Sequence, residues 1–485
     1  KLIAIIAQTF YVMKIKFCGA AQYVTGSSHL IELEDGFKIL LDCGLFQGKG
    51  AQNWEWNNHW YFNPAEINCF VLSHAHIDHC GRIPKLVKDG YNGPIHATHA
   101  TRSLCAVMLL DSAKIQEMDV QWHNEKILKK RKRDTSVLRE PLYTSEDIGP
   151  AMIKFEGHPY DVWEYIHPNV QILYKDAGHI LGSASITLKI NEGGKVTIIG
   201  FTGDIGRPDR PILRDPVQMP EVDYLICEST YGDRVHESTP EQSAQFLDVI
   251  KHTCIDKRGK LIIPAFSLGR TQEIVYMLDK MENAGLLPYI QVYVDSPLAV
   301  NVTHIFGLHP ECFDSEISEY LLTDNNPFGF NNLKYIKNVE ESKALNGDDE
   351  PCIIISASGM MNAGRVKHHL FNNIENPKNT FLMVGYCSPE TPGGILRTGA
   401  ETINIFDEEK IVRAEVVIMD SFSAHGDKNE MYDFISNQKN KTKRIFLVHG
   451  ELETQKRFKY FLQEKGFGEI DIPEPGAEFE IRNQE

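Results

Sequence analysis

The 485-residue sequence predicts an α/β fold in which chemically active side chains stand at the ends of β-strands. Short apolar runs such as 67–72 and 196–201 have the length and composition of buried strands. Several of these runs are followed at once by histidine or by a carboxylate. Between residues 232 and 420, strand-like runs alternate with small-residue turns and helix-like runs. That alternation is typical of a parallel sheet with helices on both faces.

The composition is that of an ordinary globular protein, with 42% hydrophobic and 24% charged residues. Its length allows two to four domains. A net charge of -16 argues against a protein that coats nucleic acid without specificity. The ten cysteines form no Cys-x-x-Cys pair, and most lie in apolar runs, which predicts reduced thiols and a cytoplasmic location. No apolar run approaches the ~20 residues of a membrane span.

The first region has a strand–turn–strand pattern. Asp35-Gly36 between two apolar runs is a strong hairpin signal. The next run ends at Asp42, which is either a turn former or a site acid. Met13 stands just before the first predicted strand. We therefore expect Met13 to be the natural first residue of the protein and residues 1–12 to be upstream sequence. The strands predicted here are 15–20, 28–33 and 37–41.

A metal-binding motif follows the strand at 67–72. Residues 73–80 have the sequence Ser-His-Ala-His-Ile-Asp-His-Cys, which places three imidazoles and a carboxylate within six residues. Neutral imidazole and carboxylate are ligands that suit zinc. One tetrahedral ion does not need four ligands from a single loop, so the motif predicts two metal ions close together. The alternative is a solvated histidine-rich turn. It is less favoured because an Asp-His pair next to His-x-His serves no purpose in packing.

Later strand ends carry further histidines and acids. Each one alone has an ordinary interpretation as a loop or core residue. Together with the motif at 73–80 they predict one convergent site. These residues are His179, Asp204, Glu228, His425 and His449.

Two other features allow contacts with phosphate. Residues 101–147 are predicted to be helical and contain the basic run 129–133, which either contacts a nucleic-acid backbone or is a solvated helix end. In the alternating region, turns rich in Ser and Gly stand before helices, where backbone N–H groups can bind phosphate. The competing interpretation is tight-turn chemistry alone.

The order of these motifs identifies a family resemblance. Asp42, the motif at 73–80, His179 and Asp204 resemble the successive motifs of the metallo-β-lactamase superfamily. Glu228, His425 and His449, separated by a long insert, resemble the additional motifs of its β-CASP branch, whose members cleave nucleic acids. The likeness runs from about residue 14 to 450 and is closest to bacterial and archaeal relatives of the endonuclease subunit that cuts pre-mRNA before polyadenylation. The histidine of the last motif resembles RNA-directed members, because DNA-repair members carry an apolar residue there.

The resemblance implies an αββα sandwich made by residues 13–231 and 421–485, with a parallel-sheet β-CASP domain inserted at 232–420. It also implies two Zn²⁺ ions per chain, with Mn²⁺ or Fe as alternatives, that activate a hydroxide for attack on phosphorus. One ion would be held by His74, His76 and His179, the other by Asp78, His79 and His449, and Asp204 would bridge them.

The function implied is a zinc-dependent ribonuclease that acts on single-stranded RNA in processing or decay. His425 would be the general acid, with Glu228 holding its charge, Asp42 orienting a ligand or the nucleophile, and Asp78 in a catalytic as well as a ligand role. The alternatives are a thioester or lactam hydrolase of the same sandwich, a DNA-directed nuclease, and a non-catalytic RNA-binding subunit. RNA is the expected partner, and the sequence is compatible with a homodimer. The residues expected to contact phosphate are Arg270, Ser356, Ser358, Gly359 and Arg365.

Overall fold

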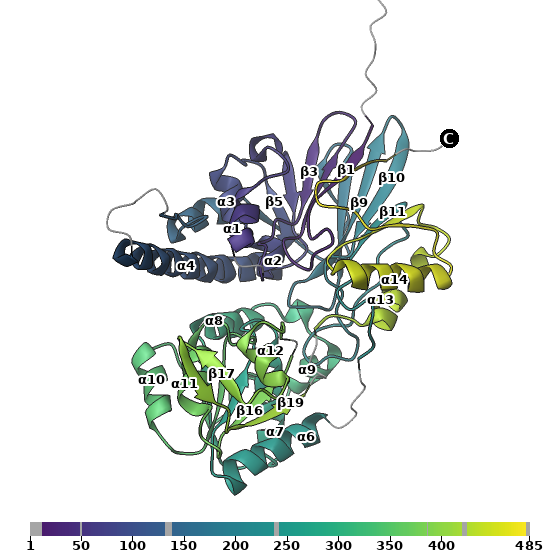
Figure 1. The fold of residues 1–485 in the computed structure, drawn as a ribbon. Helices are drawn as coiled ribbons and strands as arrows, with labels where there is room; N and C mark the ends of the chain where they lie inside the picture. The colour runs from purple at the N-terminus through teal and green to yellow at the C-terminus, as the bar shows by residue number, and fades with distance from the viewer. Residues whose placement is uncertain are drawn as a thin grey trace, which may run out of the picture. The chain divides into compact units, whose positions relative to one another are not determined.

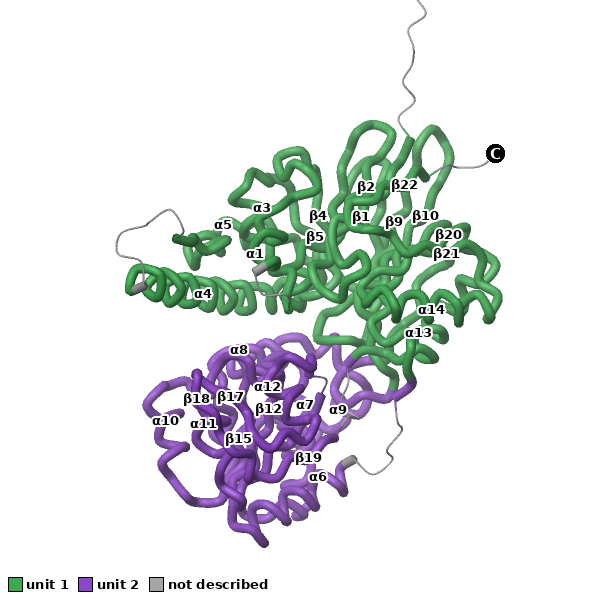
Figure 2. The backbone as a smooth tube through the Cα atoms, viewed as in Figure 1, with its two compact units in different colours: residues 1–208, 215–234, 425–485 green, residues 209–214, 235–424 purple. Residues whose placement is uncertain are grey.

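The computed structural model describes residues 12–48, 51–130, 138–236, 242–385, 387–419 and 424–481. The chain divides into two compact units (Figure 2). Unit 1 comprises residues 1–208, 215–234 and 425–485, and unit 2 comprises 209–214 and 235–424.

Residues 209–214 differ from the expected division, because we predicted them in the first domain. They belong to unit 2, and two of their side chains contact other residues of that unit. Arg210 Nη2 lies 2.6 Å from Glu273 Oε2. Arg214 Nε donates to the carbonyl of Phe313 at 3.3 Å.

Unit 1 is a sandwich of two seven-stranded sheets (Figure 1), which confirms the predicted fold class. The first sheet has the order β22 (Glu478–Glu480), β1 (Lys14–Gly19), β2 (Ser28–Glu32), β3 (Lys38–Leu41), β4 (Cys69–Val71), β5 (Ile95–Thr98), β6 (Phe155–His158). The second has the order β21 (Glu469–Asp471), β20 (Arg444–Leu447), β11 (Tyr224–Cys227), β10 (Lys195–Phe201), β9 (Ala184–Glu192), β8 (Val170–Asp176), β7 (Glu164–His167). The antiparallel pairing of β2 with β3 confirms the hairpin predicted at Asp35-Gly36.

The main core of unit 1 lies between the two sheets. Alternate residues of β1 and β9, such as Ile15, Phe17, Ile186 and Leu188, are buried in it. Burying one such side chain contributes about 1.5–3 kcal/mol. A second apolar cluster joins the outer face of the second sheet to α13 (Lys428–Ile435) and α14 (Leu452–Glu464). Figure 1 shows these two helices beside that sheet. The remaining helices of unit 1 are α1 (Ala51–Asn58), α2 (Ile77–Cys80), α3 (Ile83–Lys88), α4 (His99–Lys130) and α5 (Ile148–Met152).

The prediction of helix over 101–147 is correct only in its first part. α4 is described as far as Lys130, residues 131–137 lie outside the described residues, and residues 138–144 are not helical. The side-chain amide of Asn124 bonds the backbone of Arg139 in both directions, at 2.9 Å each, so the chain here lies against α4 rather than extending it. Pro141 then disfavours helical backbone at the residue before it. Of the basic run 129–133, residues 131–133 lie outside the described residues.

Unit 2 contains a six-stranded sheet in which every neighbouring pair is parallel, as predicted. Its order is β14 (Leu333–Tyr335), β13 (Gln291–Asp295), β15 (Cys352–Ser356), β12 (Leu261–Pro264), β16 (Thr380–Met383), β19 (Glu415–Ile418). Consecutive residues Ile353, Ile354 and Ile355 are all buried, so both faces of the sheet are covered.

The longer helices of unit 2 alternate with its strands along the chain. They are α6 (Gln242–Ile250), α7 (Arg270–Asn283), α8 (Pro297–Phe306), α9 (Ser315–Tyr320), α10 (Val339–Gly347), α11 (Arg365–Asn373) and α12 (Pro392–Arg397). A small hairpin pairs β17 (Thr402–Ile405) with β18 (Glu408–Ile411).

The cysteines agree with the prediction of reduced thiols. All ten fall within the described residues, where all are buried and none forms a disulfide. Among the helices in the described part of the chain, none is both long and apolar enough to cross a membrane.

Candidate metal centre

The loops that leave several strands of unit 1 bring the predicted site residues together. Asp42 follows β3 and the motif at 73–80 follows β4, while Asp204 and Glu228 follow β10 and β11. His449 follows β20, with a backbone φ of 52°. The groups that contribute to the site are Asp42, His74, His76, Asp78, His79, His179, Asp204, Glu228, His425 and His449.

One group of donor atoms surrounds the Oδ2 atom of Asp204. His76 Nδ1 lies 3.2 Å from both His74 Nε2 and His179 Nε2. Asp204 Oδ2 lies 3.4 Å from His74 Nε2 and 3.5 Å from His179 Nε2. Three imidazoles and one carboxylate oxygen therefore face a common point.

A second group faces the other oxygen of Asp204. His79 Nε2 lies 3.1 Å from His449 Nε2 and 3.3 Å from Asp204 Oδ1. His449 Nε2 is 3.4 Å from Asp78 Oδ2 and 3.7 Å from Asp204 Oδ1. Asp204 thus presents one oxygen to each group.

Both groups fit a bound metal ion. Zinc bonds of 2.0–2.1 Å in a tetrahedron place neighbouring ligand atoms about 3.3–3.4 Å apart. Most of the distances above lie close to this value. The buried Oδ1 of Asp204 makes no hydrogen bond within the described residues, although two ring nitrogens lie within 3.7 Å. A buried carboxylate oxygen in this position is costly unless a cation or proton compensates it.

The protonation of the first group of rings agrees with this fit. Burial, strengthened by neighbouring rings, lowers the pKa of His74, lowers that of His76 to about 3 and holds that of His179 well below its usual value. These three imidazoles are therefore neutral, which is the form that binds metals. Burial also acts to lower the pKa of His79, but the carboxylates of Asp204 and Asp42 raise it well above its usual value.

Hydrogen bonds fix the orientation of the ring of His79. Its Nδ1 donates to Asp42 Oδ2 at 2.6 Å, so Nε2 is the nitrogen that faces the second group, and metal binding there would release its proton. The buried Asp42 also accepts from the backbone N–H and hydroxyl of Ser73, at 2.8 and 2.9 Å, and from the hydroxyl of Ser27 at 3.2 Å. The carboxylate of Asp42 therefore contacts Nδ1 of His79, the ring nitrogen that does not face the second group. A residue that orients a metal ligand makes this kind of contact.

Two hydroxyl residues that we did not predict orient further rings. The single hydroxyl proton of Ser73 goes to Asp42, so Ser73 Oγ accepts from His74 Nδ1 at 3.0 Å. The hydroxyl of Thr230 donates to the carbonyl of His449 at 3.0 Å and accepts from its Nδ1 at 2.9 Å. In both histidines Nε2 is left to face the donor groups. The position of Ser73 as the first residue of the motif, directly before His74, was the only sequence signal for this role.

His425 and Glu228 form a pair beside the first group. His425 Nδ1 lies 3.4 Å from Glu228 Oε2 and 4.0 Å from Asp204 Oδ2. Glu228 is buried and accepts the backbone N–H of Ile205. Burial lowers the pKa of His425, but Glu228, Asp204 and Asp78 raise it to about 9. The side chain is 22% exposed, so this ring can meet a substrate.

Three family models match the chain in order. They are the metallo-beta-lactamase superfamily at residues 23–145, the Beta-Casp domain at 271–396, and the Zn-dependent metallo-hydrolase RNA specificity domain at 410–473. A protein named ribonuclease TTHA0252 from Thermus thermophilus is 34% identical over 91% of this chain and 94% of its own length. The chain belongs to the β-CASP branch of the metallo-β-lactamase superfamily. The family models and this relative also confirm the predicted class of enzyme, a metal-dependent hydrolase.

Other β-CASP relatives and one solved structure agree with the fold. Transcription termination factor FttA from Methanocaldococcus jannaschii is 29% identical over 92% of this chain and 68% of its own length. A crystal structure of an Enterococcus faecalis protein of unknown function covers 97% of this chain and all of the other, with a TM-score of 0.53 and 11% identity. At that identity the likeness concerns the fold alone.

The arginines of the β-CASP unit that we expected to contact phosphate already have protein partners. Arg270 is buried and pairs with Glu273. Arg365 Nη1 donates to Asp295 Oδ1 at 2.6 Å, and its Nη2 donates to the carbonyl of Lys337 at 2.7 Å.

The small residues of the same unit differ in accessibility. Ser356 is buried, and its hydroxyl donates to the carbonyl of Asp295 at 2.9 Å. Gly359 allows close packing, because a Cβ there would lie 3.0 Å from the ring of Phe266. Ser358 is less buried, and its hydroxyl donates to Asn362. The phosphate-binding role of all five residues stays a prediction.

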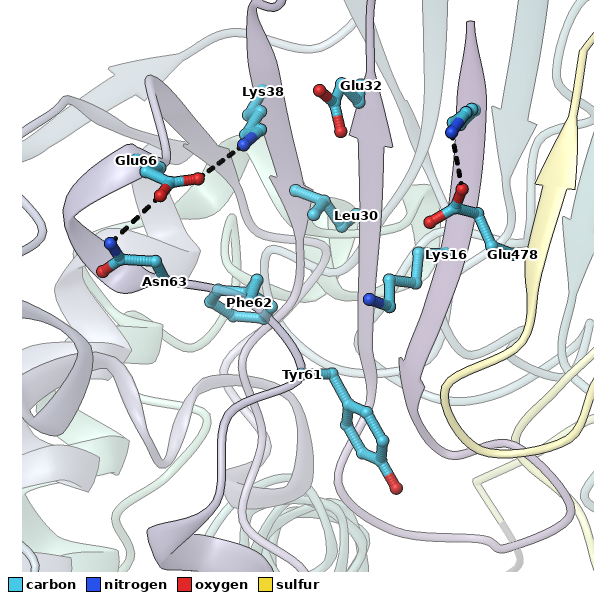
Figure 3. Close-up of a pocket in the computed structure, with 10 residues that line it drawn as sticks. Lys16, Leu30, Glu32, Lys38, Tyr61, Phe62, Asn63, Glu66 and Glu478 are labelled. Atoms are coloured by element: carbon cyan, nitrogen blue, oxygen red, sulfur yellow. Dashed lines mark hydrogen bonds and ion pairs between the residues drawn. The ribbon is translucent and has the colours of Figure 1, made fainter.

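A pocket on unit 1 is a separate feature (Figure 3). It has a volume of about 200 Å³ and contains none of the predicted site residues. Lys14 and Lys16 line it from β1, whose alternate residues face the core. Two ion pairs lie along it, Lys14–Glu478 at 2.8 Å and Lys38–Glu66 at 2.6 Å. We assign no chemistry to this pocket.

Proposed function

We propose that this protein is a metal-dependent ribonuclease that hydrolyses phosphodiester bonds of single-stranded RNA with two zinc ions. The observation that carries the proposal is the arrangement around Asp204, whose two oxygens face two separate sets of imidazole and carboxylate donors. A carboxylate placed in this way suits a pair of metal ions, which is the arrangement used in many phosphodiester hydrolases.

The first ion would be held by His74, His76 and His179, and the second by Asp78, His79 and His449, with Asp204 shared. When bound, such ions supply a Lewis acid for phosphoryl oxygens and lower the pKa of water toward neutrality. The protein's part is to fix the donor rings. Asp42 and the hydroxyls of Ser73 and Thr230 keep three of the rings in one tautomer and orientation.

His425 is the candidate general acid for the leaving oxygen. Its Nδ1 faces the carboxylate of Glu228, so Nε2 is the nitrogen available to a substrate. Glu228 is held in turn by the backbone N–H groups of Ile205 and Thr230. The carboxylate therefore orients the ring and stabilises its protonated form, as in other acid–base pairs.

RNA as the substrate is supported by two comparisons. The family model at residues 410–473 is named for RNA specificity and covers both His425 and His449. The relative from Thermus thermophilus that matches nearly its full length is named a ribonuclease.

The decisive experiment uses end-labelled RNA, incubated with and without chelator and resolved to the nucleotide. We expect cleavage that chelator abolishes, and far weaker cleavage of DNA with the same sequence. His425→Ala should keep the metal content of the wild type but lose cleavage, while the matched control His123→Ala on α4 should keep both. Full activity in His425→Ala would remove this residue from the mechanism. Turnover of a thioester without RNA cleavage would replace the proposal by another hydrolase activity.

The metals and the assembly need separate measurements. Elemental analysis after reconstitution with Zn²⁺, Mn²⁺ or Fe²⁺, followed by activity assays, tests the proposed zinc pair. Well below two catalytic ions per chain with no cleavage would favour a non-catalytic subunit. Sedimentation tests the predicted homodimer.

A further inference from the structure

A second set of metal-type ligands lies at an edge of the unit 1 sandwich. β6 is the last strand of one sheet and β7 is the last strand of the other. His96, Glu156 and His158 each offer a ligand atom within 4.8 Å of the others. This set shares no residue with the donors around Asp204.

The register of two parallel strands creates the cluster. His96 of β5 stands opposite Glu156 of β6, and His158 lies two residues further along β6. His96 Nδ1 lies 2.9 Å from His158 Nε2 and 3.6 Å from Glu156 Oε2. These distances bracket the spacing of about 3.3–3.4 Å expected for ligand atoms around zinc.

The second nitrogen of His158 points to a carboxylate on the other sheet. His158 Nδ1 contacts Oε2 of Glu164 on β7. A carboxylate that accepts from one imidazole nitrogen leaves the other with its lone pair, which is how metal-binding histidines are commonly oriented. The contact also links the two edge strands.

The accessibility of the cluster suits entry of an ion from solvent. His96 is 3% exposed and His158 is 9% exposed, so the two rings are buried and form the inner side of the cluster. The side chain of Glu156 is 61% exposed and stands at the solvent side. A hydrogen bond between the two rings also accounts for the 2.9 Å distance. An ion would take the place of the shared proton and add the carboxylate of Glu156 to the same centre.

We propose that His96, Glu156 and His158 form a third metal site, for Zn²⁺ or a similar borderline divalent cation, that joins the edge strands of the sandwich. Exposed sheet edges are weak points of β structure, and sandwiches commonly protect them. A metal held by β5 and β6, with Glu164 of β7 behind one ligand, ties three strands together. Its role is structural, because metal binding to a folded site adds directly to folding stability.

The test counts metal ions in the whole chain. Chelator-treated protein is saturated with Zn²⁺, freed of loose metal by gel filtration, and measured by elemental analysis. We expect one ion fewer per chain in His96→Leu and in Glu156→Gln than in the wild type. The matched controls His167→Leu on β7 and Glu146→Gln should retain the wild-type number. Glu164→Gln should keep the ligands but weaken the third ion by about tenfold.

The outcomes separate this site from the catalytic proposal. The result is a difference of one ion between variants, so it does not depend on whether RNA is cleaved or how many ions the Asp204 centre holds. RNA cleavage should be unchanged in Glu156→Gln. The side chain of Glu156 is exposed, so this substitution should leave the fold intact. Equal metal numbers in the wild type, His96→Leu and Glu156→Gln would overturn the proposal and leave a hydrogen-bonded imidazole pair.

Discussion

Asp42 offers the sharpest test of how the centre is held. Its carboxylate touches none of the donor atoms that face the proposed ions. It accepts from the His79 ring, from the backbone N–H and hydroxyl of Ser73, and from the hydroxyl of Ser27. We predict that Asp42→Asn weakens binding of the ion proposed for Asp78, His79 and His449 while the chain still folds.

The magnitude follows from the hydrogen bonds. An asparagine places an NH₂ group at one of the two oxygen positions, and both positions face donors. At the Oδ2 position the NH₂ would meet the ring N–H of His79, so a charge-assisted hydrogen bond is lost. Such a bond contributes about 1.5–3 kcal/mol. Since 1.4 kcal/mol is a factor of ten in affinity, we expect a loss of about 10–100-fold, the range typical of residues that orient metal ligands.

The assay is competition titration of the metal-free protein with zinc, combined with elemental analysis. The affinity loss should fall on one ion of the pair, with the ion held by His74, His76 and His179 less affected. Asp35→Asn, in the exposed turn between β2 and β3, is the matched control. Thermal melting in chelator shows whether the fold is retained. Two ions bound by Asp42→Asn with wild-type affinity would refute an orienting role for this carboxylate.

Three further predictions concern other parts of the chain. Thr230→Val should weaken the ion beside His449 by about tenfold in the same titration, because the ring loses the hydroxyl that accepts from its Nδ1. Asp279→Asn should stabilise unit 2, and by about 1–2 kcal/mol more at pH 7.5 than at pH 4.5 in chemical unfolding. Burial raises the pKa of Asp279 to about 6, above its unfolded value, so the folded wild type loses stability as the pH rises through that interval. Ile354→Ala should lower the unfolding free energy of unit 2 by about 2–5 kcal/mol without changing the zinc content, because it leaves a cavity in a core remote in sequence from the ligands.

The strands and most of the site residues were predictable because both leave local signals. A buried strand is a short apolar run, and a ligand at its end is a histidine or an acid beside a turn. Parallel neighbours end at the same edge of a sheet, so ligands far apart in sequence were expected to meet. The prediction of helix at residues 138–144 was wrong because the hydrogen bonds between Asn124 and Arg139 depend on tertiary packing, which no periodicity reveals.

Other features depend on geometry that the sequence does not encode locally. Ser73 and Thr230 are ordinary hydroxyl residues until their single proton is assigned to a partner. The cluster of His96 and His158 depends on the register of β5 against β6. Arg365 looked like a free cation, yet Asp295 at the end of β13 already neutralises it.

The insertion of unit 2 ties completion of the metal centre to the last part of the chain. β20 enters the second sheet between β21 and β11, with Leu225 opposite Ile445. The backbone N–H of His449 then donates to the carbonyl of Ala20 at 2.7 Å, which joins the C-terminal segment to the loop after β1. Until β20 is paired, Asp78 and His79 lack His449, the third donor of the proposed set. Metal affinity and pairing of this strand are therefore linked, because an ion that needs His449 stabilises only the chain in which β20 is in place.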